Sequence, residues 1–329
     1  MKILVTATNY SKYCRAGKNI LEEAGCEVIE NPYGRPCTFE ELKDIIVDID
    51  AVVAGVDTWN EEVFRLAPKL KVMARFGVGV DNIDLEAAKA HGIIVCNSPG
   101  INSSAVAEQT VTLMLSLLRQ VPEMNAAVRR GEWPRPMFHE LKSRVVGFLG
   151  FGAIARNVAQ RLQAFMPEMI AHDKFPNQEA ADSFGVRLVS QEEVIKNSDI
   201  ISIHLPAADE TKHLINRDVI KQMKKGVLIV NTARGSIVNE EDVADAFKDG
   251  IIGGFATDVF EREPVDTKGA LFGFDHYIAT PHAAAETYEN CETTSIVTAR
   301  AVLAALRGQE PENRLVEIKY RAKDSSTGD

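Results

Sequence analysis

The chain has 329 residues, of which 45% are hydrophobic and 26% charged, and its formal net charge is −10 at pH 7. A length above ~250–300 residues exceeds what one hydrophobic core usually holds, so we expect two domains. The acidic balance disfavours nucleic acid and anionic membranes as partners, and neither end carries a long apolar segment, which predicts a protein neither secreted nor membrane-spanning.

The first hundred residues alternate apolar runs with helical patterns. The runs are continuously apolar, as buried strands are, and they lie at 3–6, 27–29, 51–54, 72–74 and 93–96. We expect helices between them, capped by Thr38, Thr58 and Asp84, with both threonines forming capping boxes with a glutamate three residues later. This alternation predicts a parallel sheet with helices on both faces.

A glycine-rich loop, 75–82, follows the fourth of these strands. Open α/β sheets bind ligands beyond the carboxyl ends of their strands, so Arg75 and the backbone N–H groups of this loop are candidates for holding a carboxylate or phosphate. The glycines could instead serve only the geometry of a turn. The turn-rich segment 97–102 comes next, and we interpret it as an interdomain hinge from which a helix at about 105–118 departs.

The second half of the chain is organised around a glycine motif. An apolar run beginning at Val145 ends at Gly150, and an amphipathic pattern follows from Ile154, which is typical of strand, tight turn and helix. Gly150 would permit the turn, and Gly152 would let backbone N–H groups approach a pyrophosphate at the helix N-terminus. Ala155 takes the third small position of the motif.

A second strand, 169–172, ends at Asp173. A carboxylate at this point of the fold can accept hydrogen bonds from an adenosine ribose, and it repels a 2′-phosphate. Lys174 is the only cation directly beside it, so we favour NAD over NADP. The alternative is that Asp173 only caps the end of the strand.

Strands and helices continue to alternate after Asp173, which predicts a second complete α/β sheet. The further strands are expected at 186–189, 200–205, 227–231, 253–258 and 277–280. The final helix, about 288–306, is long enough to return to the first domain, and the polar end 323–329 is expected to fray. The loop 129–136 carries Trp133 and Arg135, and it is either a solvated loop or a partner surface.

The five cysteines lack C-x-x-C spacing and the seven histidines lack i, i+4 pairing. We therefore expect reduced thiols, a cytoplasmic protein and no metal site.

Motifs at 75–84, 150–155 with Asp173, 231–235, 258–264 and 280–282 stand in one order along the chain. With them the sequence resembles the NAD-dependent D-isomer-specific 2-hydroxyacid dehydrogenases, most closely the D-3-phosphoglycerate dehydrogenase branch in a short form without a regulatory domain. The resemblance implies a Rossmann NAD-binding domain, 102–287, inserted into a flavodoxin-like substrate domain, 1–101 and 288–329. It also implies hinges near 98–103 and 284–292, and a homodimer in which Trp133 and Arg135 lie beside the neighbouring active site.

The resemblance makes Arg234, Glu263 and His282 catalytic. His282, titrating near neutrality, can supply the proton for reduction and accept it in oxidation. Glu263 would hydrogen-bond to the imidazole and raise its pKa, and the planar guanidinium of Arg234 can bind a substrate carboxylate with two hydrogen bonds. The implied cofactor contacts are Gly150, Gly152, Ala153, Ile154, Asp173, Leu205, Pro206, Thr211, Thr232, Ala233, Arg234, Asp258, His282 and Ala284. The implied substrate contacts are Arg75, Val78, Gly79, Asn102 and Arg234.

The sequence departs from the family pattern in two places. Ala283–Ala285 replaces a glycine-rich segment after the histidine, and 54–56 reads Ala-Gly-Val where phosphoglycerate-specific members carry an arginine. The expected reaction is the interconversion of D-3-phosphoglycerate and 3-phosphohydroxypyruvate, a step of serine biosynthesis. The alternatives are a glyoxylate/hydroxypyruvate reductase and a non-catalytic NAD-sensing protein; a formate dehydrogenase is disfavoured because that branch carries glutamine at the position of Glu263.

Overall fold

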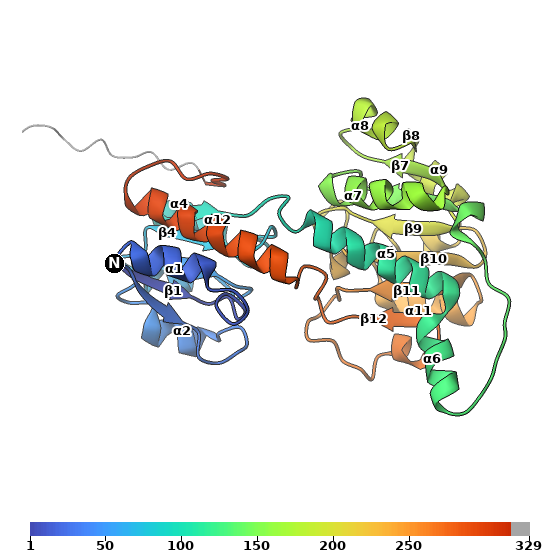
Figure 1. The fold of residues 1–329 in the computed structure, drawn as a ribbon, viewed down its shortest axis with the longest axis horizontal. Helices are drawn as coiled ribbons and strands as arrows, with labels where there is room; N and C mark the ends of the chain where they lie inside the picture. Colours follow the sequence, from blue (N-terminus) through green and yellow to red (C-terminus); the bar gives the residue numbers. More distant parts are fainter. Residues whose placement is uncertain (317–329) are drawn as a thin grey trace, which may run out of the picture. The chain divides into compact units, whose positions relative to one another are not determined.

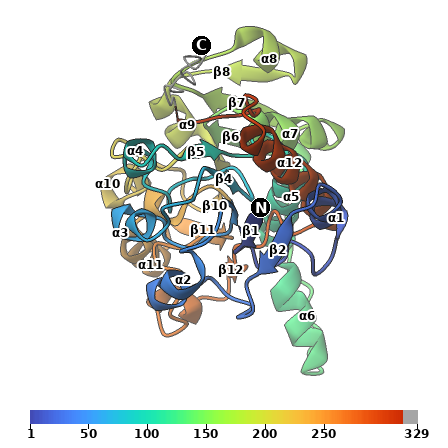
Figure 2. The same ribbon diagram turned by 90° about the vertical axis from the view of Figure 1, so that its left-hand side faces the viewer.

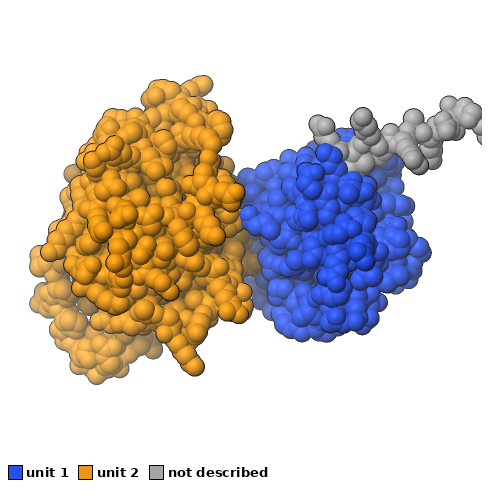
Figure 3. Space-filling model, turned by 180° about the vertical axis from the view of Figure 1, so that it is seen from behind, with its two compact units in different colours: residues 1–102, 287–329 blue, residues 103–286 orange. Residues whose placement is uncertain are grey.

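The computed structural model describes residues 1–316, and the chain divides into two compact units (Figure 3). Unit 1 is Met1–Asn102 with Thr287–Asp329, and unit 2 is Ser103–Glu286. These boundaries are adjacent to the domain limits expected from the sequence. The expected frayed end, 323–329, lies outside the described residues.

Unit 1 contains a parallel five-stranded sheet (Figure 1). Its strands are β1 (Lys2–Val5), β2 (Glu27–Glu30), β3 (Ala51–Ala54), β4 (Val72–Arg75) and β5 (Ile94–Cys96). They lie in the order β2-β1-β3-β4-β5, the flavodoxin-like order, which confirms the expected fold class for this unit.

Helices cover both faces of this sheet, because its strands are buried on both sides. Ile3 and Val5 pack with α1 (Ala16–Glu23) and α12 (Tyr288–Leu306). Leu4 points the other way, into a core shared with α2 (Phe39–Ile45), α3 (Glu61–Arg65) and α4 (Leu85–Ala90). The long final helix therefore does return to the first unit, where it packs along α1 and against β4.

Unit 2 contains a parallel seven-stranded sheet in the Rossmann order. Its strands are β6 (Val145–Leu149), β7 (Glu168–His172), β8 (Val186–Leu188), β9 (Ile200–Ile203), β10 (Val227–Asn231), β11 (Ile252–Thr257) and β12 (Tyr277–Ala279). The order is β12-β11-β10-β9-β6-β7-β8, so the direction of the chain across the sheet reverses between β6 and β9. Ligands of open α/β sheets bind at such a switch point.

The helices of unit 2 form two layers. One core packs α5 (Ser103–Arg119), α7 (Ala153–Leu162) and α8 (Gln178–Ser183) against the sheet, and the other packs α9 (Gln191–Asn197), α10 (Arg217–Ile220) and α11 (Glu240–Lys248). α5 ends at Arg119. Gln120, whose φ is +48°, is the N-cap of α6 (Val121–Arg129), which continues away from the rest of the unit (Figure 2). Short 3₁₀ segments lie at Leu141–Ser143, Gln163–Phe165, Gly235–Ile237 and Ala270–Gly273.

The capping box expected at Thr58 is wrong. α3 begins at Glu61, and its N-cap is Asn60, whose Oδ1 accepts a hydrogen bond from the Val63 N–H at 3.2 Å. Asparagine is at least as good an N-cap as threonine. Asn60 has an extended backbone, so the helix begins two residues later than the cap at Thr58 would have placed it. The caps at Thr38 and Asp84 are confirmed, with a full capping box at Thr38.

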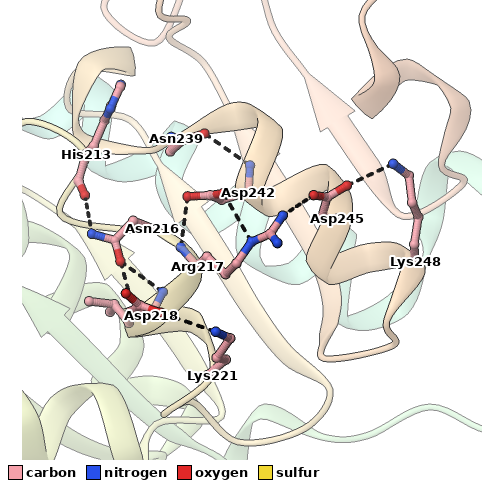
Figure 4. A network of polar contacts seen from close by, with 10 residues as sticks. His213, Asn216, Arg217, Asp218, Lys221, Asn239, Asp242, Asp245 and Lys248 are labelled. Carbon is pink, nitrogen blue, oxygen red and sulfur yellow. Dashed lines mark hydrogen bonds and ion pairs between the residues drawn. The ribbon is translucent and has the colours of Figure 1, made fainter.

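A polar network joins α10 to α11 (Figure 4). The Arg217 N–H donates to Asp242 Oδ2 at 2.9 Å, and the Arg217 guanidinium pairs with Asp245. Asn216 caps α10 through the N–H groups of two residues and donates to the His213 carbonyl at 2.9 Å. The network holds the segment that precedes α10. In this segment the Ile215 N–H donates to the carbonyl of Ile237, which follows Arg234 by three residues in the chain.

Candidate active site

Three neighbouring strands of unit 2 end at the same edge of the sheet and lead into the loops that carry the expected catalytic residues. Arg234 follows β10, Glu263 follows β11 and His282 follows β12. Because the strands are parallel, their carboxyl ends meet at this edge. The sheet topology thus brings together residues that are far apart in the sequence.

His282 and Glu263 form a hydrogen-bonded pair. His282 Nδ1 lies 2.8 Å from Glu263 Oε2, and Glu263 Oε1 accepts the Phe260 N–H at 3.0 Å. The hydrogen bond to Glu263 raises the pKa of His282 above its ordinary value, although burial opposes the shift. Burial alone would raise the pKa of Glu263, but the contacts with His282, the Phe260 N–H and Arg234 together outweigh it and leave that pKa lowered. The pair therefore favours an imidazolium held by a carboxylate, with Nδ1–H as the donor.

Asp258 holds the loop on both sides of His282. This carboxylate is 1% exposed, and it accepts hydrogen bonds from Thr280 Oγ1 at 2.5 Å, Ala283 N–H at 3.0 Å and Ala284 N–H at 2.8 Å. His282 itself has a φ of +52°, which a non-glycine residue rarely adopts. The three hydrogen bonds keep this conformation in place, so Asp258 fixes where the imidazole points.

The loop that carries Arg234 is built by Asn231 and Gly235. Asn231 is fully buried; its Oδ1 accepts the Ala233 N–H at 3.0 Å and its amide donates to the Arg234 carbonyl at 2.9 Å. A Cβ on Gly235 would lie 1.9 Å from the Phe260 carbonyl carbon, a distance that atoms do not tolerate. The glycine lets the Arg234 loop pack directly on the segment that leads to Glu263. The positive charge of Arg234 lies close enough to His282 and Glu263 to act on both. It favours the neutral imidazole and the charged carboxylate, so its own contribution lowers each pKa, although the pKa of His282 stays raised overall.

The glycine turn between β6 and α7 fits a dinucleotide phosphate. Gly150 has a φ of +88°, and a Cβ there would lie 2.6 Å from the His204 carbonyl oxygen, so only glycine fits. At Gly152, the N-cap of α7, a Cβ would meet no atom within 4 Å, which leaves the approach to the helix N-terminus open. This geometry suits a pyrophosphate held by backbone N–H groups.

Asp173 is also tied to the glycine turn. Its Oδ2 accepts the Phe151 N–H at 2.7 Å and its Oδ1 accepts the Phe175 N–H at 2.8 Å. Each carboxylate oxygen has two acceptor positions, so the ribose hydroxyls of a cofactor can still be bound. The strand-end cap that we weighed as an alternative is therefore real, and it is compatible with cofactor binding.

The other expected cofactor contacts lie on loops at the same edge. Leu205 and Pro206 follow β9, and the Thr211 hydroxyl closes their loop by donating to the Pro206 carbonyl at 2.7 Å. Thr232 lies at the end of β10, where its hydroxyl is 2.8 Å from that of Thr110 on α5. Ala153 and Ile154 begin α7. Their contact with a cofactor stays a prediction.

In unit 1, the glycine-rich loop after β4 is well organised. The Arg75 guanidinium donates to the Phe76 carbonyl, and it lies against Gly77, where a Cβ would approach it to 3.0 Å. The Val78 carbonyl accepts a hydrogen bond from Asn97 at 2.8 Å. Asn82 donates to the Asp57 carbonyl at 2.6 Å, which joins this loop to the one after β3. The substrate roles of Arg75, Val78, Gly79 and Asn102 stay predictions.

Sequence reasoning missed Thr110, and it missed the positioning roles of Asn231 and Asp258. The asparagine could have been found, because an Asn whose side chain accepts an N–H two residues later is a common turn former. Thr110 left no local signal, since its partner lies in a distant segment.

Comparison with known proteins gives consistent matches. Residues 111–284 match the model of the NAD binding domain of D-isomer specific 2-hydroxyacid dehydrogenases. The chain is 40% identical, over 95% of its length, to D-3-phosphoglycerate dehydrogenase of Methanocaldococcus jannaschii, but it spans only 59% of that protein. It is 35% identical, over 90% of its length, to glyoxylate reductase of Thermofilum pendens, of which it covers 89%.

A solved structure gives the same picture. The apo-structure of D-lactate dehydrogenase from Escherichia coli superposes with a TM-score of 0.85 and 28% identity, over 96% of this chain and 100% of that chain. Within residues 1–316, no helix is both long and apolar enough to span a bilayer.

Proposed function

Because this chain belongs to the D-isomer specific 2-hydroxyacid dehydrogenase family, we propose that it interconverts a D-2-hydroxyacid and its 2-oxoacid with NAD. The observation that carries the proposal is the His282–Glu263 pair at 2.8 Å, held beside the Arg234 loop. The presence of Arg234, Glu263 and His282 together favours catalysis over NAD sensing alone. The chain's own chemistry therefore favours an enzyme.

Each catalytic residue has a distinct role in this proposal. NAD, which the glycine turn at Gly150 and Gly152 and the Asp173 carboxylate would hold, would supply hydride transfer to or from the substrate carbon. His282 gives a proton to the substrate oxygen in reduction and takes it in oxidation, while Glu263 holds Nδ1 and stabilises the charged ring. Arg234 binds the substrate carboxylate and polarises the adjacent carbonyl. Asp258 keeps His282 in its left-handed conformation, so that Nε2 is presented to the substrate.

We propose D-3-phosphoglycerate as the substrate. The match to the M. jannaschii enzyme supports it, as does the loop at 75–82, where Arg75 offers a cation for an anionic group. A phosphate is dianionic and needs several donors to offset its desolvation, because each charged hydrogen bond contributes only ~1.5–3 kcal/mol. Arg75 is one such donor, and Arg135 of a second copy is another candidate.

A general glyoxylate or hydroxypyruvate reductase is the second candidate. The loop after β3 favours it, because Ala54, Gly55 and Val56 present no cation there and Val56 is exposed. Relatives named glyoxylate reductase and D-lactate dehydrogenase also match this chain.

A substrate panel separates these two candidates. If phosphoglycerate is the substrate, 3-phosphohydroxypyruvate should exceed hydroxypyruvate and glyoxylate in kcat/KM by at least ~10-fold, which is ~1.4 kcal/mol. Arg75→Ala should erase most of that preference. Equal kcat/KM for the three compounds would instead establish the general reductase.

We further propose a cytoplasmic homodimer acting in serine biosynthesis. All five cysteines are free thiols and four are buried, which suits a reducing compartment. Trp133 is 78% exposed and Met137 is 94% exposed, in the loop after α6. Large apolar side chains exposed in this way favour a surface that a second copy covers.

A further inference from the structure

The cation next to Asp173 is already engaged. Lys174 Nζ lies 2.9 Å from both carboxylate oxygens of Glu210, so the two side chains form an ion pair in which both oxygens accept from the ammonium. Lys174 follows β7 and Glu210 lies in the loop after β9, which places the pair across two loops at the cofactor edge of the sheet. Both side chains are about two-thirds exposed, at 64% and 63%.

Glu210 is presented by a rigid turn. The Thr211 hydroxyl, in a residue only 8% exposed, accepts the Ala208 N–H at 2.9 Å and donates to the Pro206 carbonyl at 2.7 Å. The Thr211 and Lys212 N–H groups both donate to the Ala208 carbonyl at 3.0 Å. A turn held in this way keeps Glu210 within reach of Lys174 at little entropic cost.

We propose that Glu210 is a second determinant of cofactor choice, because it withholds Lys174 from the 2′-phosphate of NADP(H). Asp173 repels that phosphate directly, and Lys174 is the cation that could compensate. Paired with both carboxylate oxygens of Glu210, the Lys174 ammonium is not directed at the adenosine ribose. The selectivity for NAD then depends on two carboxylates rather than on Asp173 alone. This inference rests on the proposed function, since it assumes that the cofactor binds at this edge.

The background for the test follows from the contacts of Asp173. Asp173→Ala would remove the acceptor of the Phe151 N–H and loosen the glycine turn, which would weaken every dinucleotide. Asp173→Asn removes the charge and keeps an oxygen acceptor for that N–H. The effect of Glu210 on cofactor affinity is therefore measured in the Asp173→Asn variant.

The experiment measures the Kd of NADPH and of NADH by cofactor fluorescence, in Asp173→Asn and in Asp173→Asn with Glu210→Gln. Glu210→Gln should tighten NADPH by ~5-fold, the upper effect of one exposed ion pair, and leave NADH within ~2-fold. The gain should shrink in 1 M salt, where the Debye length is ~3 Å. It should also disappear when Lys174→Gln is added, because the released cation is then gone.

Glu192→Gln is the matched control. Glu192 pairs with Lys196 at 2.6 Å on α9, and both side chains are exposed, so the substitution makes the same charge change elsewhere on unit 2. It should leave the NADPH Kd unchanged. Unchanged NADPH affinity on Glu210→Gln, an equal gain in the control, or a gain that survives Lys174→Gln would each overturn the proposal. Failure of the unsubstituted protein to turn over 2-oxoacids with NADH would count against the proposed function instead, and it would leave these binding ratios readable.

Discussion

The contact between Glu263 and His282 controls the protonation of the imidazole. Reduction needs the imidazolium, and Glu263 raises the pKa at which that proton is lost. Replacing Glu263 by Gln removes the negative charge, so the pKa of His282 should fall. The alkaline limit of kcat/KM for 2-oxoacid reduction should then move to lower pH, and the acidic limit of oxidation should move in the same direction. An unchanged pH profile in both directions would remove Glu263 from this role.

Much of the site at this scale could be predicted from the sequence. Arg234, Glu263 and His282 were indicated by the resemblance of their motifs, and the structure brings all three to one sheet edge. The sequence could not indicate that Asp258 clamps the loop around His282, because that role depends on three donors from a different strand end. It also could not show the pairing of Lys174 with Glu210, which are brought together only by the strand order.

At the scale of elements, the close packing of the Arg234 loop on the Glu263 loop predicts that a methyl group added at Gly235 lowers both stability and kcat. Gly235→Ala would place its Cβ 1.9 Å from the Phe260 backbone, which cannot move aside as a side chain can. We expect a loss of unfolding free energy of ~1–3 kcal/mol, as in other overpacked sites, together with a fall in kcat. Gly273→Ala, where a Cβ would meet no atom within 4 Å, is the control and should leave kcat unchanged. Equal kcat in the two variants would show that catalysis does not need the Arg234 loop to pack closely on the Glu263 loop.

The start of α3 gives a second prediction at this scale. Asn60→Ala removes the N-cap and should cost ~1 kcal/mol, whereas Thr58→Ala, an exposed residue outside the helix, should cost less than half as much. Denaturation can be followed by the fluorescence of Trp59, which is fully buried in unit 1, while Trp133 is exposed in unit 2. A larger cost for Thr58→Ala would contradict the assignment of the cap.

The positions of most elements followed from the sequence, since continuous apolar runs and caps mark them locally. The bounds of β10 and α12 agree with the expected 227–231 and 288–306. α6 and α8 were not expected. α6 is short and has a single buried residue, Ala127, so it lacks the apolar face that a periodicity argument needs.

At the scale of the whole molecule, the alternation of strands and helices indicated two parallel sheets, and the structure confirms them. The order of strands within each sheet could be expected only through the resemblance, because an apolar run does not specify its neighbours. The division between the two units lies after Asn102, at the end of the turn-rich segment 97–102, and before Thr287, the N-cap of α12.

The most direct test of the central claim is the rate at which the unsubstituted protein oxidises NADH with hydroxypyruvate or 3-phosphohydroxypyruvate, compared with His282→Ala. We expect turnover by the unsubstituted protein and a loss of ~10²–10⁴ in rate for His282→Ala, the usual contribution of a positioned acid or base. The Kd of NADH should stay within ~2-fold, because His282 moves a proton and does not hold the phosphates. Tight NADH binding without turnover of any 2-oxoacid would contradict the account and identify a protein that binds NAD without catalysis.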